Sequence, residues 1–321
     1  MCRWMRSASM LWAAGLLLAT ALVGPLFQQH MFSSLAHRLP KSPPSVYPHR
    51  HIHGRGMADG VRIHLPEGLT RDQLQSFRPF KEWMATLNRS LARQTTASHP
   101  FHADPYVLRS ITVQSFDRFG GNRLGFVKLA ASVSNAAGES LPGAALLRGP
   151  SVAVLFMLIP DDSDDADDER YAVMTVQPRI PAGSMAFAEL PAGMVDDAGS
   201  FKGAAAKEME EELGITITDD HQMTCLSELA VAGDNDEGLA TAMFPSAGGC
   251  DEHVTLYSHE RRVPRDQLRD WTGRLTGLRS EGEKITLKLV PMRDLWREGA
   301  RDAKALGALA LWEALRREGR L

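Results

Sequence analysis

Three glutamates in one short segment are the residues best suited to chemistry. Glu208, Glu211 and Glu212 occupy positions i, i+3 and i+4 of a stretch rich in Ala and Glu, and this spacing places side chains on one face of a helix. Like charges at this spacing repel one another, and a hard divalent cation bound by oxygen ligands removes the repulsion. The pattern indicates a site for Mg²⁺ or Mn²⁺, with a solvated acidic face as the alternative.

The flanking residues predict the elements that position these glutamates. Pro191 and Gly193 are typical of a loop that follows a strand. Ser200 is a suitable N-cap for the helix, and Gly214 ends it before an apolar strand resumes at Ile215. This strand–loop–helix–strand order favours the metal site over the acidic face.

The segment 190–217 resembles the Nudix box, G-x5-E-x7-R-E-U-x-E-E-x-G-U, in which U is an aliphatic residue. Gly199 stands where the box has Glu, and Lys207 stands where it has Arg. In the family these two side chains pair and brace the loop. Since both are replaced together and the metal-binding glutamates remain, the resemblance implies a modified but working site. The matching positions are Gly193, Glu208, Met209, Glu211, Glu212, Gly214 and Ile215.

Further motifs resemble the ADP-sugar diphosphatase branch of the Nudix hydrolases, in its plant and fungal forms. They occupy residues 177–183, 189–194, 244–252 and 277–283, and the similarity covers roughly residues 58–321. The implied fold class is α/β: a Nudix α/β/α sandwich with a mixed sheet, preceded by a small β-rich N-terminal subdomain. The resemblance also implies a homodimer.

The resemblance assigns the metal ligands. Glu208 and Glu212 would be the main ligands of Mg²⁺ or Mn²⁺, and Glu211 would bridge or complete the cluster. The carbonyl of Ala192, just before the first box glycine, would be the backbone ligand.

Other residues receive roles toward the substrate and the water. Arg179 matches a position suited to a diphosphate oxygen, although it could instead pair with an acidic hairpin. Ser246 and Glu252 lie in a loop that would face the substrate. Glu283 is the expected general base and Glu281 the second candidate, against the alternative of a solvated turn residue.

The implied activity is that of a Nudix pyrophosphohydrolase. Mg²⁺-dependent hydrolysis would split the diphosphate bond of an ADP-glucose, ADP-ribose or UDP-glucose type substrate into a nucleoside monophosphate and a sugar 1-phosphate. The alternative is a non-catalytic Nudix-fold module that binds a nucleotide, which the changes at Gly199 and Lys207 permit. The retained glutamates argue against this alternative, because binding alone does not need all three.

Charge divides the chain into a leader and a body. The 321 residues are 44% hydrophobic and 23% charged, as in globular proteins. Residues 1–58 contain six bases and no acid, so the remainder holds 30 bases and all 39 acids, a net charge of −9. This acidic body excludes a nucleic-acid partner such as the RNA of a decapping enzyme. Three cysteines are too few for a disulfide scaffold, and no CxxC pair suggests a zinc site.

The leader contains an uncharged, mostly apolar stretch at residues 10–27, which is of borderline length for crossing a bilayer. It predicts targeting to an organelle such as the mitochondrion, a membrane anchor or a cleaved secretory signal. Translation from Met57 would instead leave the protein in the cytoplasm. The predicted organisation is a leader and linker at 1–57, an N-terminal subdomain at 58–150 and a Nudix hydrolase domain at 151–321.

Periodicity predicts the remaining elements. Residues 70–93 fit a helix pair capped by Thr70, and residues 302–317 fit a helix. An acidic run at 161–169 is typical of a solvated, mobile hairpin tip rather than a calcium site. Strands are expected at 107–132, around a turn at 119–122, and at 151–159, 171–177 and 285–290. The apolar side of the last helix is expected to carry Ala303, Leu306, Ala310 and Leu315.

Overall fold

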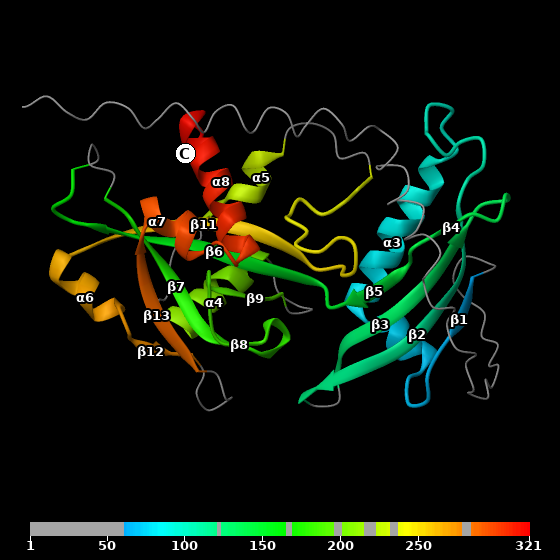
Figure 1. Cartoon of the computed structure of the whole chain (residues 1–321), viewed down its shortest axis with the longest axis horizontal. Coiled ribbons are helices and arrows are strands. Elements are labelled where there is room, and N and C mark those ends of the chain that lie inside the picture. The colour runs from blue at the N-terminus through cyan, green and yellow to red at the C-terminus, as the bar shows by residue number, and fades with distance from the viewer. Residues whose placement is uncertain are drawn as a thin grey trace, which may run out of the picture. The chain divides into compact units, whose positions relative to one another are not determined.

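Two β-sheets with packed helices make up the part of the chain that the computed structural model describes (Figure 1). The described residues are 61–120, 123–164, 169–195, 201–214, 223–231, 237–277 and 284–321. All of them lie in one compact unit. The domain boundaries at 57 and 150 stay predictions.

The first sheet has five strands in the order β1-β2-β3-β4, with β5 also paired to β3. Strands β2 and β3 form the hairpin expected at 107–132, and β1 runs parallel to β2. The bounds are β1 Arg62–His64, β2 Val107–Phe119, β3 Arg123–Ser134, β4 Ser140–Leu141 and β5 Ala144–Leu147.

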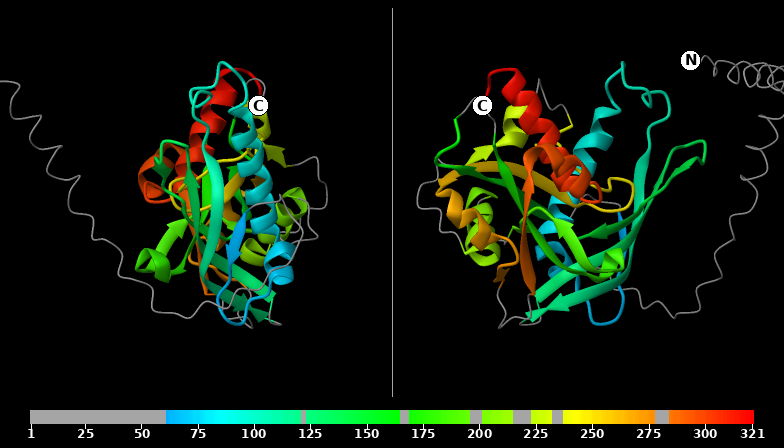
Figure 2. Two further views of the ribbon diagram at one scale, coloured as in Figure 1. Left: turned by 90° about the vertical axis from the view of Figure 1, so that its right-hand side faces the viewer. Right: turned by 60° about the vertical axis from the view of Figure 1, so that its left-hand side comes forward.

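Helices α2 (Arg71–Ser76) and α3 (Arg78–Arg93) pack against this sheet, as Figure 2 shows for α3 along β2 and β3. Thr70 caps α2 as predicted. Its hydroxyl accepts from the Gln73 N–H at 3.2 Å, and the Gln73 amide oxygen accepts from the Thr70 N–H at 3.1 Å. The helix pair supplies core residues Leu74, Phe80 and Met84.

The second sheet has eight strands and is mixed, as predicted. Its order is β10-β11-β6-β7-β13-β12, with β8 paired to β7 and β9 paired to β6. Strands β11 and β6 are parallel, and the other pairs are antiparallel. The bounds are β6 Pro150–Pro160, β7 Tyr171–Arg179, β8 Ser184–Glu189, β9 Ala192–Met194, β10 Thr224–Cys225, β11 His253–Val263, β12 Leu275–Thr276 and β13 Ile285–Pro291.

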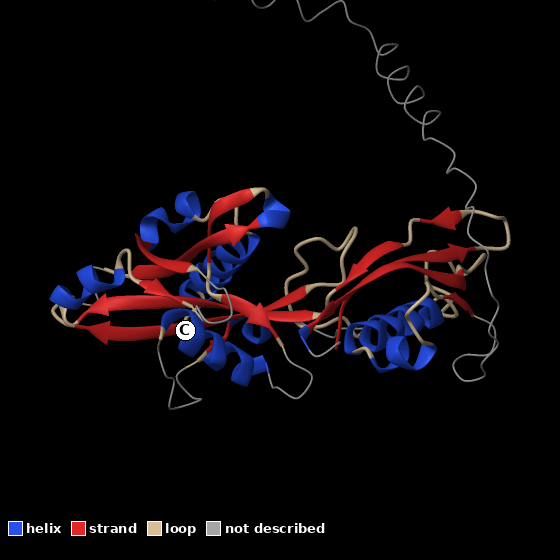
Figure 3. Ribbon diagram, turned by 90° about the horizontal axis from the view of Figure 1, so that it is seen from below, coloured by secondary structure: helices blue, strands red, loops and turns tan. Residues whose placement is uncertain are grey.

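Strand β6 explains the sandwich, because its successive side chains enter opposite cores. Val154 and Phe156 pack with α4 (Phe201–Leu213) on one face, whereas Leu155 and Met157 pack with α8 (Ala303–Arg317) on the other. Figure 3 shows helices on both faces of this sheet. The predicted α/β/α sandwich is confirmed. The shorter helices are η3 Ile180–Ala182, α5 Leu226–Ala230, η5 Arg265–Gln267, α6 Leu268–Trp271 and α7 Met292–Glu298.

The predicted apolar side of α8 is wrong at three of its four positions. Ala303 and Ala310 are exposed, and the Leu306 side chain is 40% exposed. The large Trp312 ring is buried, so the helix face that contains Trp312 is the one that packs on the core. The buried side chains are Ala305, Ala308, Leu309, Trp312 and Leu315. This rotation also buries Asp302, the N-cap of α8.

The ends of the acidic run at 161–169 are held rather than free. Arg265 pairs with Asp162 at 2.9 Å and with Glu169 at 2.7 Å. The Asp162 side chain stays 63% exposed, as expected of a solvated tip, whereas that of Glu169 is 28% exposed. Residues 165–168 lie outside the described ranges.

The helices in the described part of the chain are all too short or too polar to cross a membrane. The apolar stretch at 10–27 lies outside the described residues. The targeting, anchoring and cytoplasmic alternatives for the leader stay predictions.

Candidate active site

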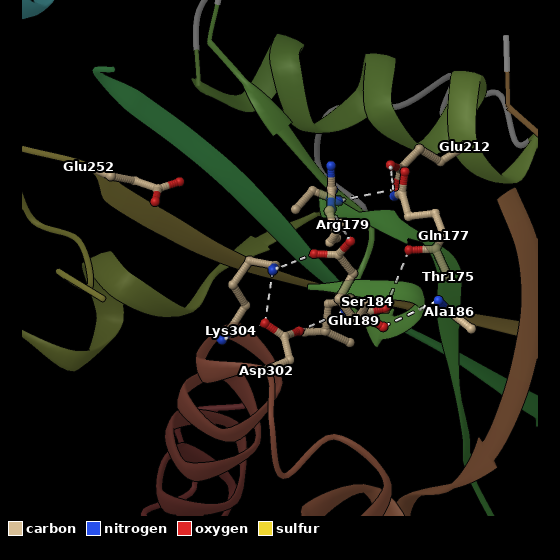
Figure 4. A network of polar contacts seen from close by, with 12 residues as sticks. Thr175, Gln177, Arg179, Ser184, Ala186, Glu189, Glu212, Glu252, Asp302 and Lys304 are labelled. Carbon is tan, nitrogen blue, oxygen red and sulfur yellow. Dashed lines mark hydrogen bonds and ion pairs between the residues drawn. The ribbon is translucent and has the colours of Figure 1, made fainter. Parts of the chain in front are cut away.

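Glu208 and Glu212 of α4 both face strand β9, which carries the residues just before and at the first box glycine. Glu212 Oε2 accepts a hydrogen bond from the Ala192 N–H at 3.2 Å, and its Oε1 accepts from Gln177 Nε2 at 3.3 Å (Figure 4). The Glu208 carboxylate lies where a β-carbon on residue 193 would be. The helix predicted from its capping residues thus brings two carboxylates to the backbone of β9.

The electrostatics around Glu212 fit a bound cation. Its side chain is buried, and burial is the main cause that raises its pKa to about 8. The charges of Glu208 and Glu189 raise the pKa further, while the Ala192 N–H and Arg179 act in the opposite direction. Hard carboxylate oxygens in such a place suit Mg²⁺ or Mn²⁺, because the cation offsets the charge that burial disfavours.

Glu211 has a different environment from its two neighbours. Its carboxylate lies 3.6 Å from Lys207 one turn earlier, and its side chain is 26% exposed. In the described ranges, no three His, Cys, Asp or Glu side chains are gathered closely enough to hold a metal ion. The structure therefore brings Glu208 and Glu212 to β9 without a closed three-carboxylate cluster, and the role of Glu211 stays a prediction.

Arg179 ends β7 and pairs with Glu189 at the end of β8. Its Nε donates to Glu189 Oε1 at 2.6 Å, and among the described residues Glu189 is its partner rather than the ends of the acidic run. Glu189 is buried, and its other oxygen accepts from Lys304 Nζ at 2.9 Å. Asp302 accepts from the same ammonium at 2.8 Å. Figure 4 shows this network beside Gln177 and Glu212.

Glu189, Asp302 and Lys304 were not among the site residues predicted from the sequence. Glu189 opens the 189–194 motif, which was a usable signal. No comparable signal marks Asp302 or Lys304, since both lie more than a hundred residues further along the chain.

The two predicted loop residues are placed in different ways. Glu252 Oε1 accepts from Ser151 Oγ at 3.2 Å and lies 3.4 Å from the Arg148 guanidinium. In Figure 4 its carboxylate stands apart from the hydrogen bonds drawn around Arg179. The Ser246 carbonyl accepts from the Cys250 N–H at 2.9 Å, which makes it part of a turn.

Several predicted positions have no structural description. Glu281 and Glu283, the candidate general bases, lie outside the described residues, and so do Gly199, Ser200 and Ile215. Their roles stay predictions.

Residues 152–311 match the NUDIX domain model. The chain is 40% identical over 214 residues to Nudix hydrolase 14, chloroplastic, from Arabidopsis thaliana, and the match covers 66% of this chain and 64% of that protein. The chain thus spans just under two thirds of the length of this relative.

Among solved structures, one described as an ADP compounds hydrolase has a TM-score of 0.39 and 18% sequence identity. The match covers 67% of this chain and 99% of that one. The box glutamates on α4, the sandwich around β6 and the matched domain model agree with one another. Residues 152–311 are therefore similar to a Nudix domain.

Proposed function

We propose that the protein is a Mg²⁺-dependent hydrolase of nucleoside diphosphate sugars. It splits the diphosphate bond and releases a nucleoside monophosphate and a sugar 1-phosphate. The observation that carries the proposal is the meeting of Glu208 and Glu212 at β9, with the cationic Arg179 in the same network. The Nudix domain supports a hydrolase. The motifs of the ADP-sugar diphosphatase branch supply the substrate class.

The metal site would be built from this chain's own oxygens. Glu208, Glu212 and the Ala192 carbonyl would hold Mg²⁺ or Mn²⁺, with Glu211 completing the set. The bound ion supplies charge neutralisation and lowers the pKa of its water. The Ala192 N–H already fixes one oxygen of Glu212, so the carboxylate is oriented before any ligand binds.

The other residues act on the substrate and the proton. Arg179 binds a diphosphate oxygen, since a guanidinium offers directed donors to phosphate. Glu283 takes the proton from the attacking water, with Glu281 as the second candidate. Ser246 and Glu252 contribute to the loop that faces the nucleotide sugar. Their contacts with the protein hold that loop in place.

The proposal includes the oligomeric state of the protein and its place in the cell. We expect a homodimer and, from the leader, delivery to an organelle or attachment to a membrane through residues 10–27. A relative whose name contains the word chloroplastic supports an organelle. The acidic body gives no path for RNA.

A hydrolysis screen tests the proposal. The purified protein is incubated with ADP-glucose, ADP-ribose and UDP-glucose, with Mg²⁺ or with a chelator, and the products are separated by chromatography. We expect a nucleoside monophosphate and a sugar phosphate only when the metal is present. Glu210→Gln is a matched control, because Glu210 is an exposed residue of α4. Nucleotide binding without hydrolysis of any substrate would favour the binding module instead.

A further inference from the structure

One buried carboxylate is shared between two cations from distant parts of the chain. Glu189 Oε1 accepts a hydrogen bond from Arg179 Nε at 2.6 Å, and Glu189 Oε2 accepts one from Lys304 Nζ at 2.9 Å. The side chain of Glu189 is only 5% exposed, whereas that of Arg179 is 40% exposed. Each oxygen therefore has one cationic partner, and Arg179 is the partner that reaches solvent (Figure 4).

Lys304 is held firmly in its place. Asp302 Oδ1 accepts from Lys304 Nζ at 2.8 Å and from the Lys304 N–H at 3.1 Å. Asp302 Oδ2 accepts from the Leu190 N–H at 2.9 Å, which ties the first turn of α8 to the residue after Glu189. With a side chain only 17% exposed, Lys304 has no route to another partner without breaking these bonds.

The arrangement limits how Arg179 can use its donors. A guanidinium beside a carboxylate frequently bonds to both of its oxygens. Here Lys304 donates to the second oxygen, and Arg179 bonds to Glu189 through Nε alone. Within the described ranges, the two Nη groups of Arg179 make no hydrogen bond.

We infer that Lys304 is a positioning residue for Arg179. By donating to Oε2 of Glu189, it holds the carboxylate in the orientation in which Arg179 bonds through Nε alone, and this leaves both Nη groups of Arg179 for a diphosphate. This inference rests on the proposed function, because it takes a diphosphate as the ligand of Arg179.

The inference predicts what happens when the ammonium is removed. In Lys304→Met, the Glu189 carboxylate loses this restraint, and Arg179 bonds to both of its oxygens through Nε and one Nη. That Nη then faces Glu189 instead of the substrate. Lys304→Arg keeps a cation on Oε2 and should rescue the wild-type behaviour. Lys288→Met is the matched control, because it breaks the ion pair of Lys288 with Glu298, which is more exposed and lies outside this network.

Binding of methylenediphosphonate, a diphosphate that water does not cleave, measures the effect by calorimetry in Mg²⁺. We expect Lys304→Met to bind it about tenfold more weakly, the scale of one lost charge-assisted hydrogen bond. Lys304→Arg and Lys288→Met should bind it as the wild type does. Thermal melting identifies folded variants, and Lys304→Gln replaces a Met variant that does not fold.

A double-mutant cycle separates positioning from a general loss of positive charge. If Lys304 acts through Arg179, Arg179→Gln weakens binding about tenfold in the wild type but less than about threefold in the Lys304→Met background. Equal effects in both backgrounds would overturn the inference, as would a folded Lys304→Met with wild-type affinity. A wild type that neither binds the diphosphonate nor hydrolyses nucleotide sugars would overturn the proposed function itself, and the inference with it.

Discussion

Gly193 of β9 and Glu208 of α4 approach so closely that a β-carbon on residue 193 would overlap the Glu208 carboxylate. The backbone of Gly193 does not need a positive φ angle, so the glycine serves this approach rather than a turn. The missing side chain therefore makes room for a predicted metal ligand.

Gly193→Ala should displace that ligand and leave the fold intact. The overlapping atoms are the far end of a flexible side chain, which can swing away at low cost. We expect the rate of Mg²⁺-dependent hydrolysis to fall by about 10–100-fold, which is the scale observed when groups that orient metal ligands are altered. Steady-state kinetics and thermal melting check this. Gly120→Ala is the control, since no heavy atom lies within 4 Å of its added β-carbon. Full activity of the Gly193 variant would exclude a ligand role for Glu208.

Glu212→Gln should remove most of the activity without weakening the metal-free fold. The amide keeps an oxygen for the Ala192 N–H but cannot carry the charge that a cation needs. Because burial and the nearby Glu208 disfavour a charged Glu212, we expect the metal-free melting temperature to stay equal or rise. Mg²⁺ should raise the melting temperature of the wild type and not that of the variant. Comparable turnover at saturating Mg²⁺ would contradict the assignment.

Glu283→Gln tests the general base. The amide preserves the shape of the side chain but does not take a proton, so turnover should fall by about 10²–10⁴ while substrate binding is retained. Glu281→Gln is measured beside it. If turnover falls in Glu281→Gln but hardly changes in Glu283→Gln, the general base is Glu281. If turnover hardly changes in either variant, neither residue is the general base.

Acid stability should depend on the pair that Arg265 makes with Glu169. Hydrogen bonds from Arg265 first, and then from Tyr171, lower the pKa of Glu169 from 4.5 to about 2. A lowered folded-state pKa contributes stability above the unfolded-state value, and this contribution is lost as the pH falls toward 2. The melting-temperature difference between the wild type and Arg265→Met should therefore be constant near neutral pH and shrink between about pH 4.5 and about pH 2.

The same variant provides its own control. Arg265 pairs with Asp162 and Glu169, away from the network of Arg179, so hydrolysis at neutral pH should be unchanged. A melting-temperature difference that persists undiminished down to pH 2 would show that Arg265 stabilises the fold by packing rather than by charge.

The part of the site that local sequence encodes was predictable. Ser200 and Gly214 predicted a helix between them, and α4 runs from Phe201 to Leu213. Gly214 has φ +68°, and its N–H donates to the Glu210 carbonyl, as expected of a helix-ending glycine. Caps and helical spacing act within a few residues, so a single sequence carries them.

Contacts between distant residues were not predictable from the same signals. Lys304 and Glu189 are 115 positions apart, and their meeting depends on how α8 packs across the sheet. The face of α8 was misjudged because several rows of that helix are apolar, and only Trp312 in the tertiary core selects among them. The Lys207–Glu211 approach of 3.6 Å is different, because the two residues are four positions apart and their spacing could have indicated it.

Strand β6 is synthesised long before the strand with which it pairs along its full length. Its eleven residues are all buried and carry no charge, and its full-length parallel partner β11 pairs residue 150 with residue 253. Ribosomes add roughly 5–20 residues per second, so β6 waits about 5–20 seconds for that partner. In the meantime β7 pairs only with Met157 and Leu158, and β9 pairs only with residues 151–153. During this interval the nascent chain exposes an uncharged, unpaired strand edge, which makes it a ready substrate for chaperones and the first point at which crowded expression would lead to aggregation.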